Sequence, residues 1–203
     1  FAMLLARLAD PTAGQVMLGG VDLRMVSADD RRRSVRMVPQ DGFLFDTTVG
    51  ANIRFGRRDS TEADVQAAVD ELGLCTWVAG LPAGLDTRGG ERGSSLSVGE
   101  RQLVALLRAQ LADPGLLILD EATSAVDPDT EQTLERALEH LAEGRTTVSV
   151  AHRLSTAERS DLVLVFDRGR IVENGSHAEL AEAGGTYAAL YESWLGNTRL
   201  MEA

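Results

Sequence analysis

The strongest constraint on the fold is an apolar run at residues 116–119 that ends in two adjacent carboxylates, Asp120 and Glu121. Four consecutive Leu and Ile residues are typical of a strand that is buried on both faces, as in a parallel sheet covered by helices. Ligands of such sheets bind beyond the carboxyl ends of the strands, where these two acidic side chains follow. The run therefore predicts an α/β fold with a polar site at one edge of the sheet.

Helix and strand signals alternate on both sides of this run. Asp127-Pro128 predicts a helix start, because Asp is a good cap and Pro fits the first helical position, and the helix should end at Gly144. Residues 1–8 have the apolar spacing of a helix. Further strands are predicted at residues 36–39, 146–151, 162–166 and 170–173, the last two joined by a hairpin turn at 167–169.

The sequence between the strand at 36–39 and the run at 116–119 is mainly helical in character. Thr61, with Asp64 three residues on, predicts a capped helix that should end at Gly73. We therefore expect an α/β core at 1–40 and 105–203, and a helical subdomain inserted at 41–104. Residues 15–18 and 21–23 flank Gly19-Gly20, so an antiparallel β-hairpin is expected near the N-terminus.

Composition excludes several classes of protein. The net charge of −11, from 31 acidic and 20 basic residues, argues against a nucleic-acid surface, which needs Lys and Arg to neutralise phosphates. The apolar runs are far shorter than the ~18 residues of a membrane-spanning helix. The single Cys75 excludes an internal disulfide and a Cys-based zinc site. His140 and His177 are interpreted as ordinary exposed residues.

Ser97-Val98-Gly99-Glu100 precedes the run at 116–119 by about one helix length. The spacing matches a capping box, in which the Ser97 and Glu100 side chains each bond the other residue's backbone amide. A helix N-terminus also offers free amides and a positive dipole end to an anion. The segment thus predicts a helix start and allows an anion site.

Five short segments, spread over essentially the whole chain, resemble in their order the motifs of ATP-binding cassette (ABC) transporters. They are Gln40, Ser97-Val98-Gly99-Glu100, Asp120-Glu121, Ser124-Ala125-Val126-Asp127 and His152. The resemblance implies a P-loop NTPase-like core with a mostly parallel sheet, and ATP and Mg²⁺ as cofactors. It implies that Asp120 and Gln40 hold Mg²⁺ and that Glu121 is the general base, assisted by His152 and Gln40. It also implies that the nucleotide is contacted by Ser97, Gly99, Glu100, Asp127 and Asp120.

The chain departs from the family pattern in two places. Val98 and Glu100 stand where the family signature has Gly and Gln, so Glu100 adds a carboxylate near a polyphosphate. No phosphate-binding loop of the form G-x-x-x-x-G-K-[ST] occurs in the sequence. The resemblance therefore implies a chain truncated at its N-terminus just after that loop, with a gap in the central sheet, which alone should not hydrolyse ATP.

Two segments resemble the exporter branch of the family. Residues 38–56, with Phe43 and Phe45, resemble the region that receives the membrane domain, and residues 89–93 resemble an exporter coupling motif. The resemblance implies a transmembrane domain, upstream in the same chain or as a separate subunit, and a second nucleotide-binding domain in a homodimer or heterodimer. It places the domain on the cytoplasmic face of the cell membrane, with no nucleic-acid partner.

Besides a domain that powers export, two other interpretations remain open. The chain could instead be a non-hydrolysing fragment that acts only as a binding or interaction module. A soluble ABC ATPase outside transport is the third possibility, which the acidic charge and the two exporter-like segments disfavour.

Overall fold

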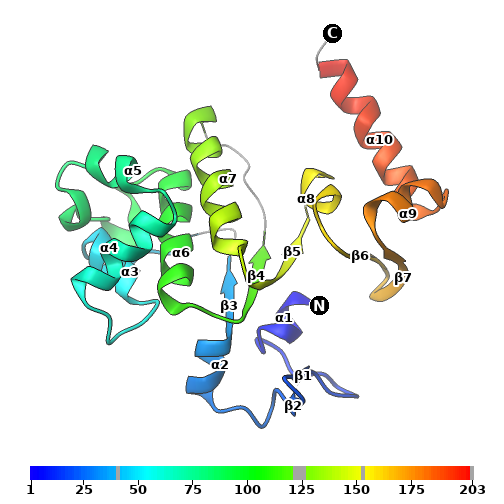
Figure 1. Ribbon diagram of the computed structural model, residues 1–203, viewed down its shortest axis with the longest axis horizontal. Coiled ribbons are helices and arrows are strands. Elements are labelled where there is room, and N and C mark those ends of the chain that lie inside the picture. The colour runs from blue at the N-terminus through cyan, green and yellow to red at the C-terminus, as the bar shows by residue number, and fades with distance from the viewer. Residues whose placement is uncertain (40–41, 121–126, 152–153, 202–203) are drawn as a thin grey trace. The chain divides into compact units, whose positions relative to one another are not determined.

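A computed structural model describes residues 1–39, 42–120, 127–151 and 154–201 (Figure 1). The chain divides into two compact units, Phe1–Val150 and Ala151–Ala203. Each unit has its own apolar cluster of buried side chains. The expected division into a core at 1–40 and 105–203 and a subdomain at 41–104 stays a prediction. No helix in the described ranges is both long and apolar enough to cross a membrane.

The first unit contains the predicted parallel sheet. Its strands are β3 (Val35–Val38), β4 (Leu116–Asp120) and β5 (Thr146–Val150), in the order β3-β4-β5. Val38 pairs with Leu119, and Asp120 pairs with Val150, so all three strands point the same way. The central strand is the most buried, with Leu117 and Ile118 fully enclosed, as its unbroken apolar sequence predicts.

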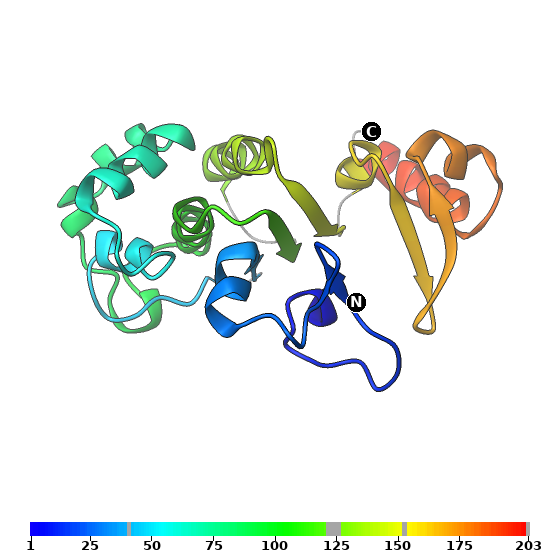
Figure 2. The same ribbon diagram turned by 60° about the horizontal axis from the view of Figure 1, so that its bottom comes forward.

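Helices α6 (Val98–Ala112) and α7 (Pro128–Ala142) pack against each other beside this sheet (Figure 2). Helix α7 begins as predicted, with Asp127 as its cap and Pro at its first position. Its buried face carries Leu134, Ala137 and Leu141. These buried positions recur at helical spacing, which gives the helix one packed side.

A layer of short helices covers the far side of α6. It consists of α3 (Val49–Arg54), α4 (Glu62–Glu71), α5 (Cys75–Gly80) and the 3₁₀ turns η1 (Gly84–Asp86) and η2 (Glu91–Gly93). Thr61 and Asp64 form the predicted capping box of α4. The layer and α6 share fully buried side chains, including Leu44, Val49, Ile53, Val69, Leu103, Val104 and Leu107.

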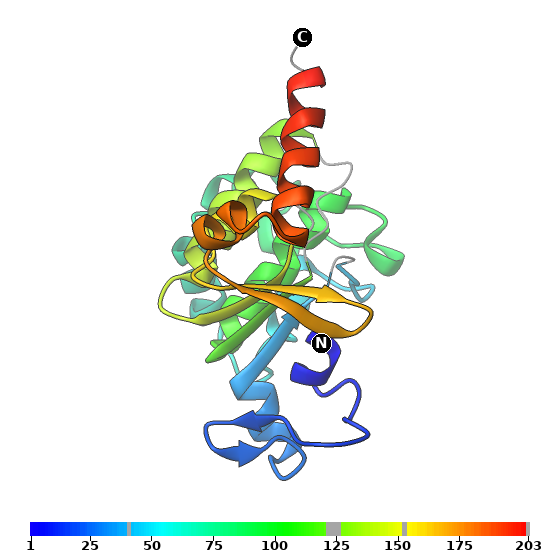
Figure 3. The ribbon, with the colours of Figure 1, turned by 90° about the vertical axis from the view of Figure 1, so that its right-hand side faces the viewer.

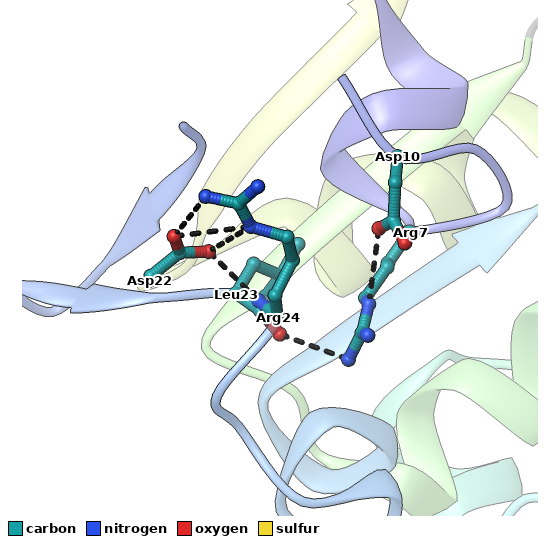
Figure 4. Close-up of polar contacts among 5 residues, drawn as sticks. All are labelled: Arg7, Asp10, Asp22, Leu23 and Arg24. Carbon is teal, nitrogen blue, oxygen red and sulfur yellow. Dashed lines mark hydrogen bonds and ion pairs between the residues drawn. The ribbon is translucent and has the colours of Figure 1, made fainter. Parts of the chain in front are cut away.

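The N-terminal segment contains α1 (Ala2–Leu5), the predicted hairpin of β1 (Met17–Leu18) and β2 (Val21–Asp22), and α2 (Ala28–Ser34). The prediction of a helix over 1–8 was too long. Arg7 has a φ of 51°, which takes the backbone out of the helix, and its side chain donates to Asp10 (3.2 Å) and to the Leu23 carbonyl (3.2 Å). These bonds tie the end of α1 to the hairpin (Figure 4).

The second unit contains α8 (Leu154–Glu158), the hairpin strands β6 (Val163–Asp167) and β7 (Arg170–Gly175), α9 (His177–Glu182) and α10 (Thr186–Met201) (Figure 3). Arg168 and Gly169 both have positive φ, as a two-residue hairpin turn requires. The expectation that His177 is an ordinary exposed residue was wrong. Its Nδ1 lies 2.8 Å from the Tyr187 hydroxyl, and its ring packs edge-on against Tyr191, so it is half-buried.

Candidate functional site

The parallel sheet brings the ends of three strands to one edge. Because β3, β4 and β5 are adjacent and in register, the residues that follow Val38, Leu119 and Val150 leave the sheet on the same side. The carboxyl edge of such a sheet is where ligands of α/β proteins bind. The three predicted catalytic residues, Gln40, Glu121 and His152, follow these strand ends in the sequence, and they lie outside the described residues.

Asp120 is the described acidic group of this edge. It is the last residue of β4 and is half-buried. Within the described ranges, its carboxylate has no hydrogen bond or ion pair. A carboxylate is the hard oxygen ligand that Mg²⁺ prefers, and Mg²⁺ sites use one or two carboxylates with substrate phosphates and water. The described residues contain no group of three or more His, Cys, Asp or Glu side chains that could hold a metal ion.

The start of α6 has the predicted capping box. Ser97 Oγ accepts from the Glu100 amide (3.2 Å), and Glu100 Oε2 accepts from the Ser97 amide (2.8 Å). Ser97 and Val98 are exposed and Gly99 is buried. The first amides of the helix, those of Val98 and Gly99, have no acceptor within the helix. The helix start thus offers amide donors and a positive dipole end to an anion.

Glu100 has a more structural environment than the other residues of this segment. Besides the bond to the Ser97 amide, its Oε1 accepts from Trp77 Nε1 (3.3 Å), so both carboxylate oxygens are occupied by the chain itself. A second negative charge near a triphosphate is unfavourable. These contacts support Ser97 and the neighbouring amides as nucleotide contacts more strongly than they support Glu100, whose assignment stays a prediction.

Asp127 lies at the start of α7, after the residues 121–126 that follow β4. Its Oδ1 accepts from the Thr130 amide (3.0 Å), and this bond to the backbone lowers the pKa of the carboxyl below its ordinary value. The side chain is exposed. It is therefore charged at neutral pH and occupied with capping its own helix, and its predicted role toward the nucleotide is not tested by these contacts.

The segment after β3 exposes an aromatic patch, defined as Phe43, Phe45 and Phe55. All three rings are more than two-fifths exposed, whereas Leu44 between them is fully buried. Phe45 lies 5.1 Å from Phe43 and 4.3 Å from Phe55, measured between ring centroids. Exposed aromatic groups clustered in this way are typical of protein interfaces.

A polar clamp beneath the aromatic patch was not predicted. Asn52 is fully buried; its side chain accepts from the Phe45 amide (2.9 Å) and donates to the carbonyls of Phe45 and Thr48 (3.0 Å each). Arg108 of α6 donates to the Asn52 carbonyl (2.8 Å), to Asn52 Oδ1 (2.6 Å) and to the Phe43 carbonyl (2.5 Å). Burial, and then the charge of Arg36, lowers the pKa of Arg108 to about 10.

The sequence did contain a signal for this clamp. Asn52 stands between Val49 and Ile53 on the apolar face of α3, and Arg108 follows Leu107 in an apolar helix. A polar residue on a buried face needs a buried partner. The pattern indicates that each residue needs a partner, and only the fold identifies that partner across 56 positions of sequence.

The turn at 89–93 packs directly beside the segment of the aromatic patch. The Gly89 amide donates to the Thr47 carbonyl (2.9 Å), and the Val49 amide donates to the Thr87 carbonyl (2.9 Å). Thr48 and Arg88 form a β-bridge. The two segments that resemble the exporter branch, far apart in sequence, thus form one continuous surface of the first unit.

Comparison with known proteins places the chain. The family model for the ABC transporter matches residues 1–124. The ATP-dependent lipid A-core flippase of Ralstonia nicotianae is 46% identical over 93% of this chain and 32% of the flippase. The ATM1-type heavy metal exporter of Novosphingobium aromaticivorans is 44% identical over 94% of this chain and 31% of the exporter.

A solved structure of a bacterial Atm1-family ABC exporter with ATP bound superimposes with a TM-score of 0.86 and 42% identity, covering 95% of this chain and 34% of that one. The chain therefore spans about a third of the length of the relatives it matches. The order of motifs, the parallel sheet and these matches agree, and the chain belongs to the ABC transporter family.

Proposed function

We propose that this chain is the ATP-binding and ATP-hydrolysing domain that powers export of a substrate across a membrane. The observation that carries the proposal is the sheet edge at which β3, β4 and β5 end together, with Asp120 at the end of β4. This arrangement supports a shared site for Gln40, Asp120 and Glu121, all of which belong to the first unit. Phosphoryl transfer depends mainly on positioning and charge stabilisation, which a rigid sheet edge provides.

The donor set of the edge fits Mg²⁺ and ATP. When bound, Mg²⁺ neutralises the phosphate oxygens of the nucleotide. Asp120 would hold the ion together with Gln40, and Glu121 would accept a proton from the attacking water. His152 would orient that water. The Ser97 hydroxyl and the first amides of α6 would bind the terminal phosphate of a nucleotide. That nucleotide would be held by a second nucleotide-binding domain in a dimer.

The aromatic patch and the turn at 89–93 support the presence of a membrane-domain partner. Phe43 and Phe45 present apolar area on a surface that Asn52 and Arg108 hold in place from below. A transmembrane domain, fused or separate, is the partner that this surface fits in an exporter. The domain would then lie on the cytoplasmic face of the membrane.

The general-base role gives the sharpest test. In the protein expressed from the complete gene that encodes this chain, Glu121→Gln should lower Mg²⁺-dependent kcat for ATP by about 10²–10⁴-fold, since a carboxamide cannot accept the proton. Glu143→Gln, which changes an exposed glutamate just after α7, is the matched control and should leave kcat unchanged. Equal rates for the wild type and Glu121→Gln would overturn the proposal.

A second function is favoured by the absence of a phosphate-loop pattern in residues 1–203. Without the loop lysine and its amides, the 203-residue chain lacks the main cradle for a triphosphate. We infer that this chain alone acts only as a binding or interaction module, with no ATPase activity above background. Mg²⁺-dependent turnover by the purified chain, lost in Glu121→Gln, would contradict this inference.

A further inference from the structure

A hollow lies in the first unit, away from the edge at which the strands end. It has a volume of about 240 Å³ and lies between the end of α1, the last turn of α2 and the beginning of β3. The proposed nucleotide site follows the other end of β3. The hollow is lined by Ala6, Leu8, Arg31, Arg32, Val35, Arg36 and Met37.

Arg36 is an incompletely hydrogen-bonded cation of this hollow. Its Nη2 donates to the Gly56 carbonyl (2.8 Å), whereas its Nε is buried and has no hydrogen-bond partner among the described residues. A buried donor that is left unpaired costs about 1–3 kcal/mol. Native structures seldom keep such a donor without a ligand, ion or water that accepts from it.

The positive charge around Arg36 is not neutralised by the described part of the chain. Arg31 is half-buried, and within the described ranges its side chain forms no hydrogen bond or ion pair. Arg32 pairs with Asp29 (2.5 Å), and both of these side chains are largely exposed. Burial, and then the nearby charge of Arg32, lowers the pKa of Arg36. The hollow therefore has a local excess of positive charge, although the whole chain has a net charge of −11.

The remaining walls of the hollow are apolar and held in place. Ala6, Leu8, Val35 and Met37 contribute hydrocarbon surface. The intervening Arg7 fixes the end of α1 by its bonds to Asp10 and the Leu23 carbonyl (Figure 4). The hollow thus combines two guanidinium groups with an apolar wall.

We propose that this hollow binds a small organic oxyanion, with its carboxylate or phosphate group on Arg31 and Arg36 and its hydrocarbon part against Leu8, Val35 and Met37. Guanidinium groups match the geometry of carboxylates and phosphates through paired N–H donors. An oxyanion in the hollow pairs with the guanidinium groups of Arg31 and Arg36, both of which line it. This site is separate from the nucleotide site and does not depend on ATP binding.

The test follows the Nε–Hε signals of arginine in ¹H–¹⁵N spectra of the 203-residue chain. The Arg36 signal is the one lost in Arg36→Lys. Sodium phosphate, acetate and butyrate are titrated at constant ionic strength, with sodium chloride as the balancing salt. We expect a saturable shift of the Arg36 signal, and butyrate should bind about tenfold more tightly than acetate because its two extra CH₂ groups meet the apolar wall. The relative affinity of phosphate identifies which head group the site prefers.

Arg31→Gln should weaken binding by at least about fivefold, the loss of one charge-assisted hydrogen bond. Arg33→Gln is the matched control, because Arg33 lies in the same last turn of α2 and does not line the hollow. Ser97→Ala removes a contact of the proposed nucleotide site and should leave the Arg36 titration unchanged. The proposal is overturned if no probe shifts the Arg36 signal, if chloride reproduces the shift, or if Arg33→Gln weakens binding as much as Arg31→Gln. Equal affinity for acetate and butyrate would remove the apolar wall from the site.

Discussion

The helical layer around α6 and the C-terminal unit achieve order in different ways. In the layer and α6, residues such as Ile53, Val104 and Leu107 are fully enclosed and form part of one large apolar cluster. The cluster of the C-terminal unit has four buried members, Ala157, Val165, Leu180 and Tyr187, while Leu162 and Ile171 are exposed. The layer is therefore stabilised mainly by burial, and the C-terminal unit depends more on individual polar contacts.

Glu173 and His177 illustrate the polar contacts of the C-terminal unit. Glu173 accepts from the backbone amides of Thr186 and Tyr187 at the start of α10, the latter at 3.0 Å. His177 is hydrogen-bonded to the Tyr187 hydroxyl. Such bonds are directional and contribute about 1 kcal/mol each, so this unit should respond to pH and to single polar substitutions more than the helical layer does.

The largest effect is expected for Leu107→Ala. The side chain is fully buried in α6, so its truncation leaves a cavity and should lower the free energy of unfolding by about 2–5 kcal/mol. Chemical denaturation followed by circular dichroism measures this loss. A matched pair tests the difference: Val104→Ala in α6, beneath the layer, should cost more stability than Val165→Ala in the C-terminal unit. Equal losses for the two valines would show that the regions do not differ in packing.

Asn52→Ala should be the next most destabilising change. It removes the acceptor of the Phe45 amide and of Arg108, and the donor to two carbonyls, in a fully buried position. We expect a loss of roughly 2–4 kcal/mol. In Arg108→Ala, the additional effect of Asn52→Ala should be smaller, because the two residues share bonds. Strict additivity in this double-mutant cycle would mean that the clamp is not a unit.

Gly56→Ala tests how closely the layer approaches α6. A Cβ at Gly56 would lie within van der Waals overlap of the Arg108 carbonyl oxygen, at 2.2 Å, so the backbone must shift at a cost of about 1–3 kcal/mol. Gly115→Ala is the control, because its added Cβ meets nothing closer than 4.0 Å. That change should alter stability by no more than about 0.5 kcal/mol. The denaturant midpoints of the two variants measure this difference in stability.

The smallest effect is a pH dependence of the C-terminal unit. The bonds from the Tyr187 and then the Thr186 amide lower the pKa of Glu173. A folded-state pKa below the ordinary value of 4.5 means that this stabilisation is complete above about pH 4.5 and is lost as the pH falls through the folded-state pKa. Hydrogen exchange of the α10 amides should therefore accelerate in acid.

Glu173→Gln should flatten this acid response, since a carboxamide does not titrate. Glu192→Gln, which changes an exposed glutamate of α10, is the control and should leave the response intact. An unchanged acid response in Glu173→Gln would assign it to other carboxyl groups.

Features with local causes were predicted well from the sequence. The caps at Thr61, Ser97 and Asp127 depend on residues no more than three positions apart, and the structure confirms each of them. The strand at 116–119 follows from an unbroken apolar run, and its parallel neighbours were predicted within one residue of their observed bounds. The sheet edge that carries the candidate site was therefore predictable, although the roles of Gln40, Glu121 and His152 stay predictions.

Features that depend on distant contacts were not predicted. The partners Asn52 and Arg108 are 56 residues apart, and Trp77 meets Glu100 across 23 residues. The early end of α1 depends on bonds from Arg7 to Leu23, which no periodicity in residues 1–8 encodes. The burial of His177 depends on Tyr187 and Tyr191 from another helix. Local pattern specifies an element, and only tertiary contact specifies these pairs.

The clamp of Arg108 has a mechanical consequence. Helix α6 has 15 residues and a length of about 22 Å. An unbroken helix of that size moves as a rigid body. Ser97 caps one end, and Arg108, three turns along, grips the backbone beneath Phe43. A ligand that displaces Ser97 along the helix axis will therefore displace Arg108 as well. Through the bond of Arg108 to the Phe43 carbonyl, this displacement reaches the aromatic patch.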